Sequence, residues 1–238
     1  MRRTLLTLEP KTILHIDECH AIAKQAAEEL LLVLEEGVVH VKSGVDEPPI
    51  RLCLEPGTVI CSTTRPSALS APLRQRFGLH FHFCFYSVEE LTQITQAMAE
   101  RLGVTFEPAV CEAVAHRALG IPRICLRHVE RVRDVVQVRR ATMATMDELD
   151  LAMRIEGIDH RGLQADYRRI LRVLAKNEPR GVSARSLALA LGTQESTVKE
   201  VLEPPLIRLE LMIVTPGGRR ITQNGLEHLA RARHEVVV

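Results

Sequence analysis

The 238-residue sequence has no apolar run of the roughly 20 residues that a membrane-spanning helix requires, which excludes a transmembrane protein and a membrane partner of that kind. It has no internal repeat or low-complexity tract, and its first residues lack the apolar core and small-residue cleavage site of a secretory signal. The composition is 46% hydrophobic and 26% charged, as in soluble globular proteins. A chain of this length can hold two or three small units, each with its own core.

A C-x-x-C pair is missing as well, although the sequence contains six cysteines. Each of them stands among apolar neighbours, so we expect reduced core thiols rather than zinc ligands or disulfides. The six are Cys19, Cys53, Cys61, Cys84, Cys111 and Cys125. Several histidines invite a metal interpretation, but alternation along strands explains them better. They are His15, His20, His80 and His82. Together these features predict a cytoplasmic protein.

A mostly apolar, β-favouring run over residues 13–16 ends in two adjacent carboxylates, Asp17 and Glu18. This is the Walker B arrangement of a P-loop ATPase, in which a strand delivers the acids to the edge of the sheet where nucleotides bind. Asp17 could hold Mg²⁺ through water, and Glu18 could polarise the water that attacks the γ-phosphate of ATP. Taken alone, the pair fits equally well a buried strand that meets two solvated acids at a turn.

The phosphate cradle that such a site requires, G-x-x-x-x-G-K-[ST], does not precede this strand. Only sixteen residues lie upstream of Asp17, and none of them is glycine. The sequence therefore predicts one half of an ATPase site without the other half.

The first third of the chain reads as a mixture of short strands and helices. We expect helices over residues 21–36, ending at Gly37, and over residues 70–76. A hairpin is expected from residues 38–41 and 50–54, a short buried strand at 58–62, and an alternating strand at 79–85. An α/β domain over residues 1–86 follows from this pattern.

The rest of the chain reads as two further domains. From Ser87, a plausible N-cap, the pattern is helical as far as residue 159, so residues 87–160 are expected to form an all-α unit. A polar break at 157–162 marks the next boundary. Beyond it come three helical segments, a hairpin around residues 216–218 and a final helix, so residues 161–238 are predicted to form a winged helix-turn-helix. This last segment holds thirteen Lys and Arg against eight Asp and Glu, an excess that favours nucleic acid as a partner.

Several motifs resemble one known family in collinear order, from about residue 5 to about residue 225. The segments are 13–20, 61–65, 69–78, 120–124, 127–134, 201–206 and 215–219. They closely resemble the RuvB family, the AAA+ motors that drive branch migration of Holliday junctions. The resemblance implies an α/β plus all-α fold, with the C-terminal part of a P-loop AAA+ domain, a helical lid and a winged helix. It also implies ATP and Mg²⁺ as cofactors, and a homo-hexamer or a ring with complete RuvB-like subunits.

The resemblance assigns roles to individual residues. Asp17 and Glu18 match the Walker B acids, and Thr64 matches the sensor-1 position that helps to place the attacking water. Arg76 matches the arginine finger, which reaches into the next subunit's site. A guanidinium suits that role because it is permanently charged and forks onto phosphate oxygens. Arg123 matches the sensor-2 arginine, which leans from the lid onto the nucleotide.

The winged helix of the family contacts DNA, as a Holliday junction or as a duplex. Here Lys199 lies on the exposed side of the predicted recognition helix, and Arg219 and Arg220 are expected at the tip of the wing. Charged side chains there can meet phosphates without reading bases. The alternative is that the wing-tip arginines are only solvated.

Two departures from the family pattern bear on function. Without the P-loop portion, a ring of this chain alone is not expected to hydrolyse ATP. The hairpin that docks on RuvA in the family carries His40, Lys42, Ser43, Asp46 and Glu47 here, which weakens the expectation of a RuvA-like partner.

Three explanations of the absent P-loop stay open, namely a fragment of a longer product, a degenerate paralogue, or a second chain that supplies the missing half. Two functions follow, a RuvB-type ATPase and DNA helicase subunit or a non-enzymatic RuvB-like protein that binds DNA or modulates a ring. A transcription factor fits poorly, because Thr64, Arg76 and Arg123 would then have no reason to occur together.

Overall fold

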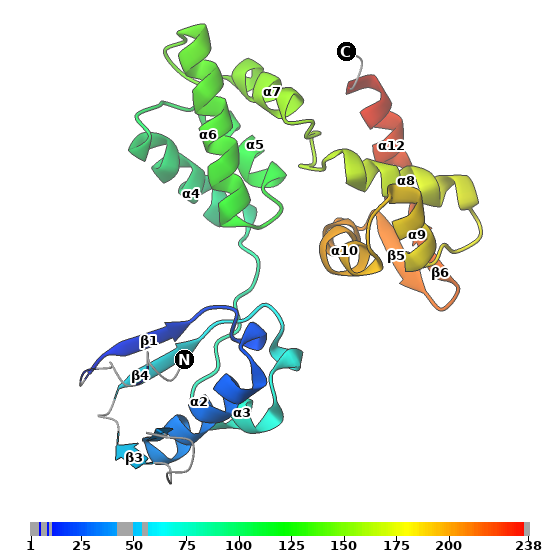
Figure 1. The fold of residues 1–238 in the computed structure, drawn as a ribbon. Coiled ribbons are helices and arrows are strands. Elements are labelled where there is room, and N and C mark those ends of the chain that lie inside the picture. The colour runs from blue at the N-terminus through cyan, green and yellow to red at the C-terminus, as the bar shows by residue number, and fades with distance from the viewer. Residues whose placement is uncertain (1–4, 6–8, 10, 42–49, 54–56, 236–238) are drawn as a thin grey trace. The chain divides into compact units, whose positions relative to one another are not determined.

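The structure, a computed structural model, describes residues 5, 9, 11–41, 50–53 and 57–235. The chain divides into two compact units, Met1–Phe83 and Cys84–Val238, shown as a ribbon in Figure 1. The division falls ahead of the expected boundary at 86/87, because the backbone N–H of Tyr86 donates to Gly120 O at 3.0 Å and the ring of Phe85 lies 3.9 Å from the guanidinium of Arg208. No helix of the described residues is long and apolar enough to cross a membrane.

The described elements of the first unit include two pairs of strands and two α-helices. In chain order these are β1 (Ile13–Ile16), α2 (Lys24–Glu36), β2 (Val38–Val41), β3 (Ile50–Cys53), β4 (Thr58–Cys61) and α3 (Ala71–Arg76). β1 and β4 run parallel, with Ile16 opposite Cys61, and β2 and β3 form the expected antiparallel hairpin. The turn of that hairpin, with Lys42, Ser43, Asp46 and Glu47, lies outside the described residues.

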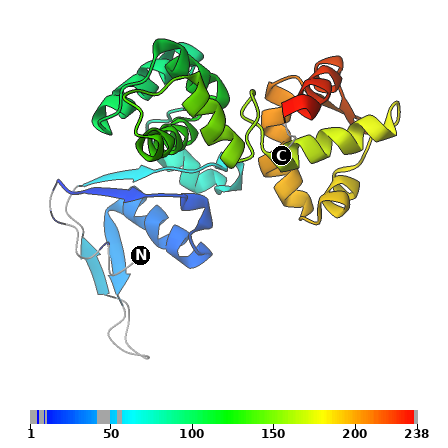
Figure 2. The same ribbon diagram turned by 90° about the horizontal axis from the view of Figure 1, so that it is seen from above.

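Helix α2 ends where the sequence predicts, because Gly37 adopts a left-handed conformation with φ of 66° that a glycine reaches at no steric cost. It begins later than expected, at Lys24, since Cys19–Ala21 form a separate 3₁₀ turn. Figures 1 and 2 both show α2 along one side of the β1–β4 pair. The small core on that side consists of Ile16, Cys19, Leu30 and Leu73.

The strand expected over residues 58–62 is formed, as Thr58–Cys61, but the expectation that it is buried is wrong. β4 alternates between exposed and half-buried residues, and Ile60 is 47% exposed. Ile13 of β1 is also exposed. The reason is that one face of the strand pair packs on α2 and α3, while no element of the described residues covers the other face.

The predicted strand over residues 79–85 is not formed. Its side chains point into solvent, and Phe83 is 97% exposed. The alternating pattern is suited to a strand, but a strand needs a neighbour to satisfy its backbone N–H and C=O groups. Among the described residues, no strand lies beside this segment.

Two of the six thiols also differ from expectation, because Cys53 and Cys84 are exposed rather than in a core. Cys19, Cys111 and Cys125 are buried as expected, and none of the six takes part in a disulfide. Burial raises the pKa of the Cys61 thiol to about 12, with a further contribution from Cys19, so this thiol stays protonated at neutral pH.

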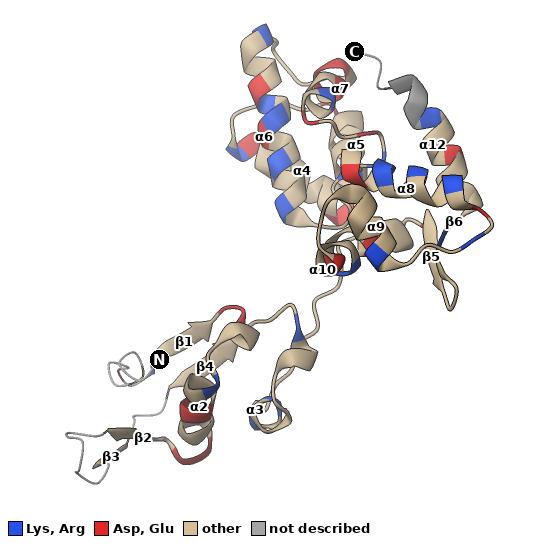
Figure 3. Cartoon of the chain, turned by 45° about the vertical axis from the view of Figure 1, so that its right-hand side comes forward, with Lys and Arg blue, Asp and Glu red and all other residues tan. Residues whose placement is uncertain are grey.

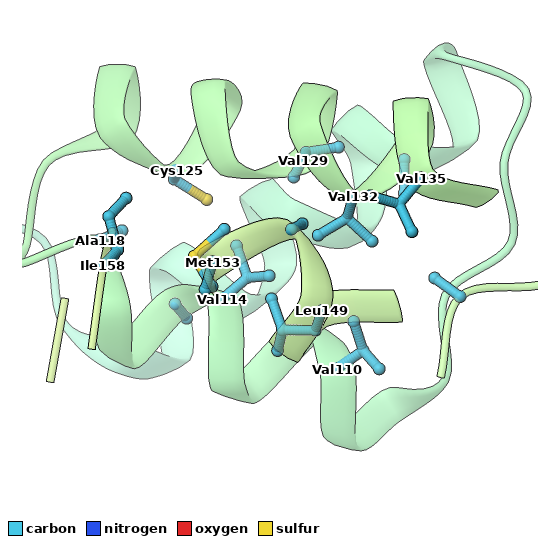
Figure 4. Close-up of a cluster of buried hydrophobic side chains, with 14 of the residues drawn as sticks. Val110, Val114, Ala118, Cys125, Val129, Val132, Val135, Leu149, Met153 and Ile158 are labelled. Carbon is cyan, nitrogen blue, oxygen red and sulfur yellow. The ribbon is translucent and has the colours of Figure 1, made fainter. Parts of the chain in front are cut away.

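The first half of the second unit is a bundle of α4 (Val88–Arg101), α5 (Pro108–Arg117), α6 (Pro122–Arg139) and α7 (Met146–Ile155). Ser87 caps α4 as predicted: its hydroxyl accepts from the N–H of Glu90, whose carboxylate in turn accepts from the N–H of Ser87. Figure 4 shows valines of α5 and α6 pointing toward Leu149 and Met153 of α7. This bundle therefore has a complete core of its own.

The second half has the order of a winged helix around a second core. Its elements are α8 (Ala165–Asn177), α9 (Ala184–Leu191), α10 (Glu195–Thr197), a π-helical turn (Val198–Leu202), α11 (Glu203–Arg208), β5 (Met212–Thr215), β6 (Gly218–Ile221) and α12 (Gln223–Glu235). The third of the helical segments expected in this domain thus contains an irregular turn, Val198–Leu202. Pro204 and Pro205 explain it, because they lack N–H groups and their rings crowd the carbonyls of Glu200 and Val201.

The polar break at 157–162 is built around a buried carboxylate. Asp159 accepts hydrogen bonds from Arg168 Nη1 at 3.2 Å, from His228 Nε2 at 3.0 Å, and from the N–H groups of Arg161 and Leu163 at 3.0 Å. Gly162 follows with φ of 82°, where a Cβ would lie only 2.1 Å from the carbonyl oxygen of residue 117. Only glycine fits this close approach.

Candidate functional site

The candidate site lies at the carboxyl ends of β1 and β4. Asp17 and Glu18 follow β1, and a run of three hydroxyl side chains, residues 62–64, follows β4. The parallel pairing continues beyond the strands, because Ser62 N–H donates to Ile16 O and Cys19 N–H donates to Ser62 O, both at 3.0 Å. The acids and the hydroxyls therefore meet at one edge of the sheet.

Glu18 and Thr64 are in direct contact, as the matched Walker B and sensor-1 positions suggest. The Glu18 carboxylate accepts from the N–H of Thr64 at 3.0 Å and from its hydroxyl at 3.1 Å. The backbone hydrogen bond from Thr64 is the main reason why the pKa of Glu18 is lowered, and its hydroxyl and His20 lower it further. Glu18 also adopts a left-handed conformation with φ of 47°, which is unusual for a non-glycine residue and turns its side chain toward β4.

Asp17 is held by a second set of contacts. Its Oδ1 accepts from the Ser62 hydroxyl at 2.7 Å and from the N–H of Glu18 at 3.0 Å. His15 Nε2 lies 3.0 Å from the same Ser62 oxygen. Because Ser62 donates its single proton to Asp17, His15 must carry the proton on Nε2 to complete the chain. One Asp17 oxygen is thus held by two donors, the Ser62 hydroxyl after β4 and the Glu18 N–H after β1.

His20, at the turn after Glu18, contacts both the Glu18 carboxylate and a hydroxyl of the run that follows β4. Its Nδ1 lies 2.9 Å from Thr63 Oγ1 and 3.1 Å from Glu18 Oε2. Sequence reasoning did not identify His15, His20 or Ser62 as site residues. The run of hydroxyl residues after β4 is the signal that could have identified them. Because β1 and β4 are parallel neighbours, residues that follow β4 lie beside residues that follow β1.

These donors fit a hydrated Mg²⁺ ion better than a directly bound metal. Among the described residues, no group of three or more His, Cys, Asp or Glu could hold a metal ion. Mg²⁺ keeps several waters and commonly takes one carboxylate together with phosphate oxygens, and Asp17 offers such a carboxylate. When bound with ATP, the ion would neutralise charge on the phosphates. Residues 1–238 contain no G-x-x-x-x-G-K-[ST] segment, the pattern of the loop that grips phosphates in P-loop ATPases.

The two remaining ATPase positions lie on helices outside this edge. Arg76 is in the last turn of α3, half-exposed, and its Nη2 pairs with Glu35 Oε1 of α2. Arg123 belongs to the second unit, where it is exposed in the first turn of α6 directly after Pro122. The structure therefore brings together Asp17, Glu18 and Thr64, while Arg76 lies on α3 of the same unit and Arg123 belongs to the other unit.

The expected placement of the wing arginines is wrong. Both lie in β6 rather than at the tip, and both are engaged in ion pairs. Arg219 Nε lies 2.8 Å from Glu203 Oε1, with both side chains largely buried, and Arg220 Nη2 lies 2.8 Å from Glu178 Oε2. Lys199 is exposed as expected and pairs with Glu195 one turn earlier, at 2.6 Å. The wing thus uses its arginines to hold the hairpin to the helices.

The fold and these motifs define the class, namely an AAA+ P-loop domain with a helical lid and a winged helix. Family models match three consecutive parts of the chain. The "Holliday junction DNA helicase RuvB P-loop domain" matches residues 1–83, the "RuvB AAA lid domain" residues 86–159, and the "RuvB C-terminal winged helix domain" residues 160–230.

Curated relatives agree with these matches. RuvB of Thermotoga maritima is 35% identical over 96% of this chain and 70% of its own length, and RuvB of Synechococcus sp. WH7803 is 38% identical over 94% and 63%. RuvB of Rhodococcus erythropolis is 40% identical over 88% and 58%. The solved T. maritima RuvB branch migration motor superposes with a TM-score of 0.81 at 34% identity, covering 96% of this chain and 72% of that one. The chain belongs to the RuvB family, and it spans part of the length of these relatives.

Proposed function

We propose that this chain is a subunit of a RuvB-type motor that uses ATP to drive branch migration of Holliday-junction DNA. The observation that carries the proposal is the contact between Glu18 and Thr64 at the carboxyl edge of β1 and β4. A carboxylate that is ionised and turned toward a second polar strand end is suited to orient a water molecule. Family membership supplies the partner chemistry, since the relatives are named as subunits of the Holliday junction branch migration complex.

In this proposal each residue of the edge has one task. Asp17, fixed by Ser62, orients the water shell of Mg²⁺, and Glu18 polarises the attacking water. Thr64 donates to both oxygens of Glu18, but a carboxylate has about four acceptor sites, so Glu18 can accept a further hydrogen bond from the attacking water while it keeps Thr64.

Residues 1–238 by themselves are proposed not to hydrolyse ATP, because none of them forms a phosphate-gripping loop of the expected sequence. The test is the ATP turnover of the purified 238-residue chain beside its Glu18→Gln variant. We expect both to match the buffer background. A turnover that Glu18→Gln abolishes would contradict this and would require a phosphate site of another sequence.

Arg76 is proposed to act in trans when the chain joins complete RuvB-like subunits. It would first leave Glu35, at a cost below about 1 kcal/mol for an exposed pair. In mixed rings the unaltered chain should support hydrolysis at the neighbouring site, whereas Arg76→Ala should abolish it there. Arg74→Ala, on the same exposed helix, is the matched control. Equal activity of all three mixtures would reduce Arg76 to a surface residue.

A second candidate function is a non-enzymatic RuvB-like protein that binds DNA or modulates a ring, which is the function that residues 1–238 would keep by themselves, since they include no G-x-x-x-x-G-K-[ST] segment. Mixed rings in which a P-loop segment is also supplied to this chain separate the two. If the chain's own site turns over, Glu18→Gln lowers the total rate. If it only modulates the ring, Glu18→Gln leaves the rate unchanged while Arg76→Ala still lowers it.

A further inference from the structure

We propose that the exposed face of α8, formed by Arg169, Arg172 and Lys176, binds the phosphate backbone of duplex DNA. We call these three residues the α8 stripe. The inference rests on the proposed function in that it takes DNA as the partner, and it goes further by assigning the contact to a surface that the wing and recognition-helix positions do not include.

The stripe follows from helical geometry. Positions i, i+3 and i+7 fall on one side of an α-helix, and the three cations have this spacing. The core residues Ile170, Leu171 and Leu174 occupy the opposite side, where they are fully buried. The stripe is therefore turned away from the domain core and extends along the axis for about 10 Å, at 1.5 Å per residue.

In Figure 3, segments in the colour of Lys and Arg recur along the length of α8.

The cations of the stripe differ from those of the wing in their partners. Arg219 and Arg220 are each held by a glutamate, Glu203 and Glu178. In the described part of the chain, neither Arg172 nor Lys176 forms an ion pair. Arg169 Nη2 donates a long hydrogen bond of 3.4 Å to the carbonyl oxygen of Ala190. Arg169 Nη1 lies 3.4 Å from Asp166 Oδ1, with both side chains of this ion pair about half-exposed or more. Such an exposed pair contributes less than about 1 kcal/mol and yields readily to a phosphate.

A solvated basic face is the simplest alternative, and it accounts for the stripe only in part. A cation in the last turn of a helix is stabilised by the helix dipole, and this effect alone explains a lysine at position 176. Arg169 and Arg172 lie earlier in α8, where this effect has faded. A row of guanidinium and ammonium groups in which Arg172 and Lys176 form no ion pair among the described residues and Arg169 has only the exposed Asp166 as an acidic neighbour matches the phosphate backbone of a duplex, which carries a regular row of negative charges.

The test compares two charge-matched variants of the full 238-residue chain. The stripe variant is R169A/R172A/K176A. The reference variant, R185A/K199A/R220A, removes the same charge from α9, the recognition segment and the wing. All six side chains are exposed or half-exposed. Five of them lie in helical segments, where alanine preserves the helix, while Arg220 lies in β6 and pairs with Glu178. Binding is therefore compared only after both variants have been shown to keep the circular dichroism spectrum and the urea midpoint of the unaltered chain. Binding to a fluorescent linear duplex and to an immobile four-way junction is measured from 50 to 200 mM salt.

The stripe variant should flatten the slope of log affinity against log salt by about 2 to 3 units, since each phosphate contact contributes about 0.9. The reference variant should keep a slope close to that of the unaltered chain. If the slope flattens for the reference variant and stays unchanged for the stripe variant, the DNA contact lies on the recognition segment and the wing. That result would overturn the inference while leaving DNA binding in place. Equal flattening of both would show diffuse attraction and overturn it as well.

Two further outcomes complete the test. If the unaltered chain binds neither DNA at 50 mM salt, the DNA-binding part of the proposed function fails and the inference fails with it. If polyglutamate competes as effectively as duplex at equal charge concentration, the stripe is a general site for acidic surfaces and the assignment to DNA is wrong.

Discussion

Glu18 in the first unit and Asp159 in the second are both carboxylates that accept several hydrogen bonds, yet their surroundings are opposite. The Glu18 side chain is 44% exposed, and its donors come from Thr64 and His20. The Asp159 side chain is fully buried and is enclosed by Arg168 and His228. Exposed hydrogen bonds can exchange with water, whereas buried ones cannot be given up without a large desolvation penalty. The first arrangement is suited to chemistry and the second to holding the fold together.

The same contrast extends to the cores of the two units. Four residues, Ile16, Cys19, Leu30 and Leu73, make up the buried cluster of the first unit, while the second unit contains two much larger clusters. Sites that must move during a reaction are commonly found in the less stable parts of a protein. The sequence offers a way to follow the units separately, because it has no tryptophan and both its tyrosines, Tyr86 and Tyr167, lie in the second unit.

The largest effect is expected for Asp159→Asn. This change leaves the buried Arg168 guanidinium without its counter-charge, and breaking a buried pair in this way costs about 3–5 kcal/mol. Urea unfolding followed by tyrosine fluorescence measures the loss in the second unit. Asp166→Asn, an exposed carboxylate at the start of α8, is the control and should change stability by less than about 0.5 kcal/mol. A small loss for Asp159→Asn would contradict its structural role.

His128 is expected to make the second unit sensitive to acid. Burial lowers its pKa to about 4, below the ordinary value of 6.5. At neutral pH it is uncharged in both the folded and the unfolded states. As the pH falls from 6.5 toward 4 the unfolded chain takes up a proton first, so stability declines over this window, by roughly 3 kcal/mol at about 1.4 kcal/mol per pKa unit.

The measurement is the urea midpoint, by tyrosine fluorescence, at a series of pH values. His128→Gln should remove this part of the decline, whereas His116→Gln, at an exposed position of α5, should keep it. If the two variants lose stability in parallel, the decline belongs to other groups.

Leu73→Ala should weaken the first unit by about 2–3 kcal/mol, because it removes one of the few fully buried side chains there. Far-ultraviolet circular dichroism should show this loss, while tyrosine fluorescence should not change. Leu79→Ala serves as the matched control, since Leu79 is 77% exposed and should contribute almost nothing. A shift of the tyrosine signal by Leu73→Ala would mean that the two units unfold as one.

Features that depend on neighbouring residues could be predicted from the sequence. Gly37 ends α2 and Ser87 begins α4 where their local chemistry requires it, and the wing hairpin turns at residues 216–218 as expected. The roles of Glu18 and Thr64 were predicted in another way, through the resemblance of both motifs to one family, while their direct contact was not predicted. Local pattern alone left Asp17 and Glu18 open to a second interpretation.

Features that depend on distant residues could not be predicted. The alternation of residues 79–85 suggests a strand, but whether a strand forms depends on a neighbour elsewhere in the chain. Arg219 and Arg220 read as solvent-facing because their partners, Glu203 and Glu178, are far away in sequence. The polar break at 157–162 read as a simple loop, since nothing nearby reveals that His228 closes over Asp159.

The polar contacts of Glu18 are assigned here to the site rather than to the fold. Urea unfolding of Glu18→Gln, followed by far-ultraviolet circular dichroism beside Asp159→Asn, tests this assignment. We expect Glu18→Gln to leave the urea midpoint of the first unit unchanged, because the affected hydrogen bonds are exposed. A loss as large as that of Asp159→Asn would contradict the account and make Glu18 a structural residue.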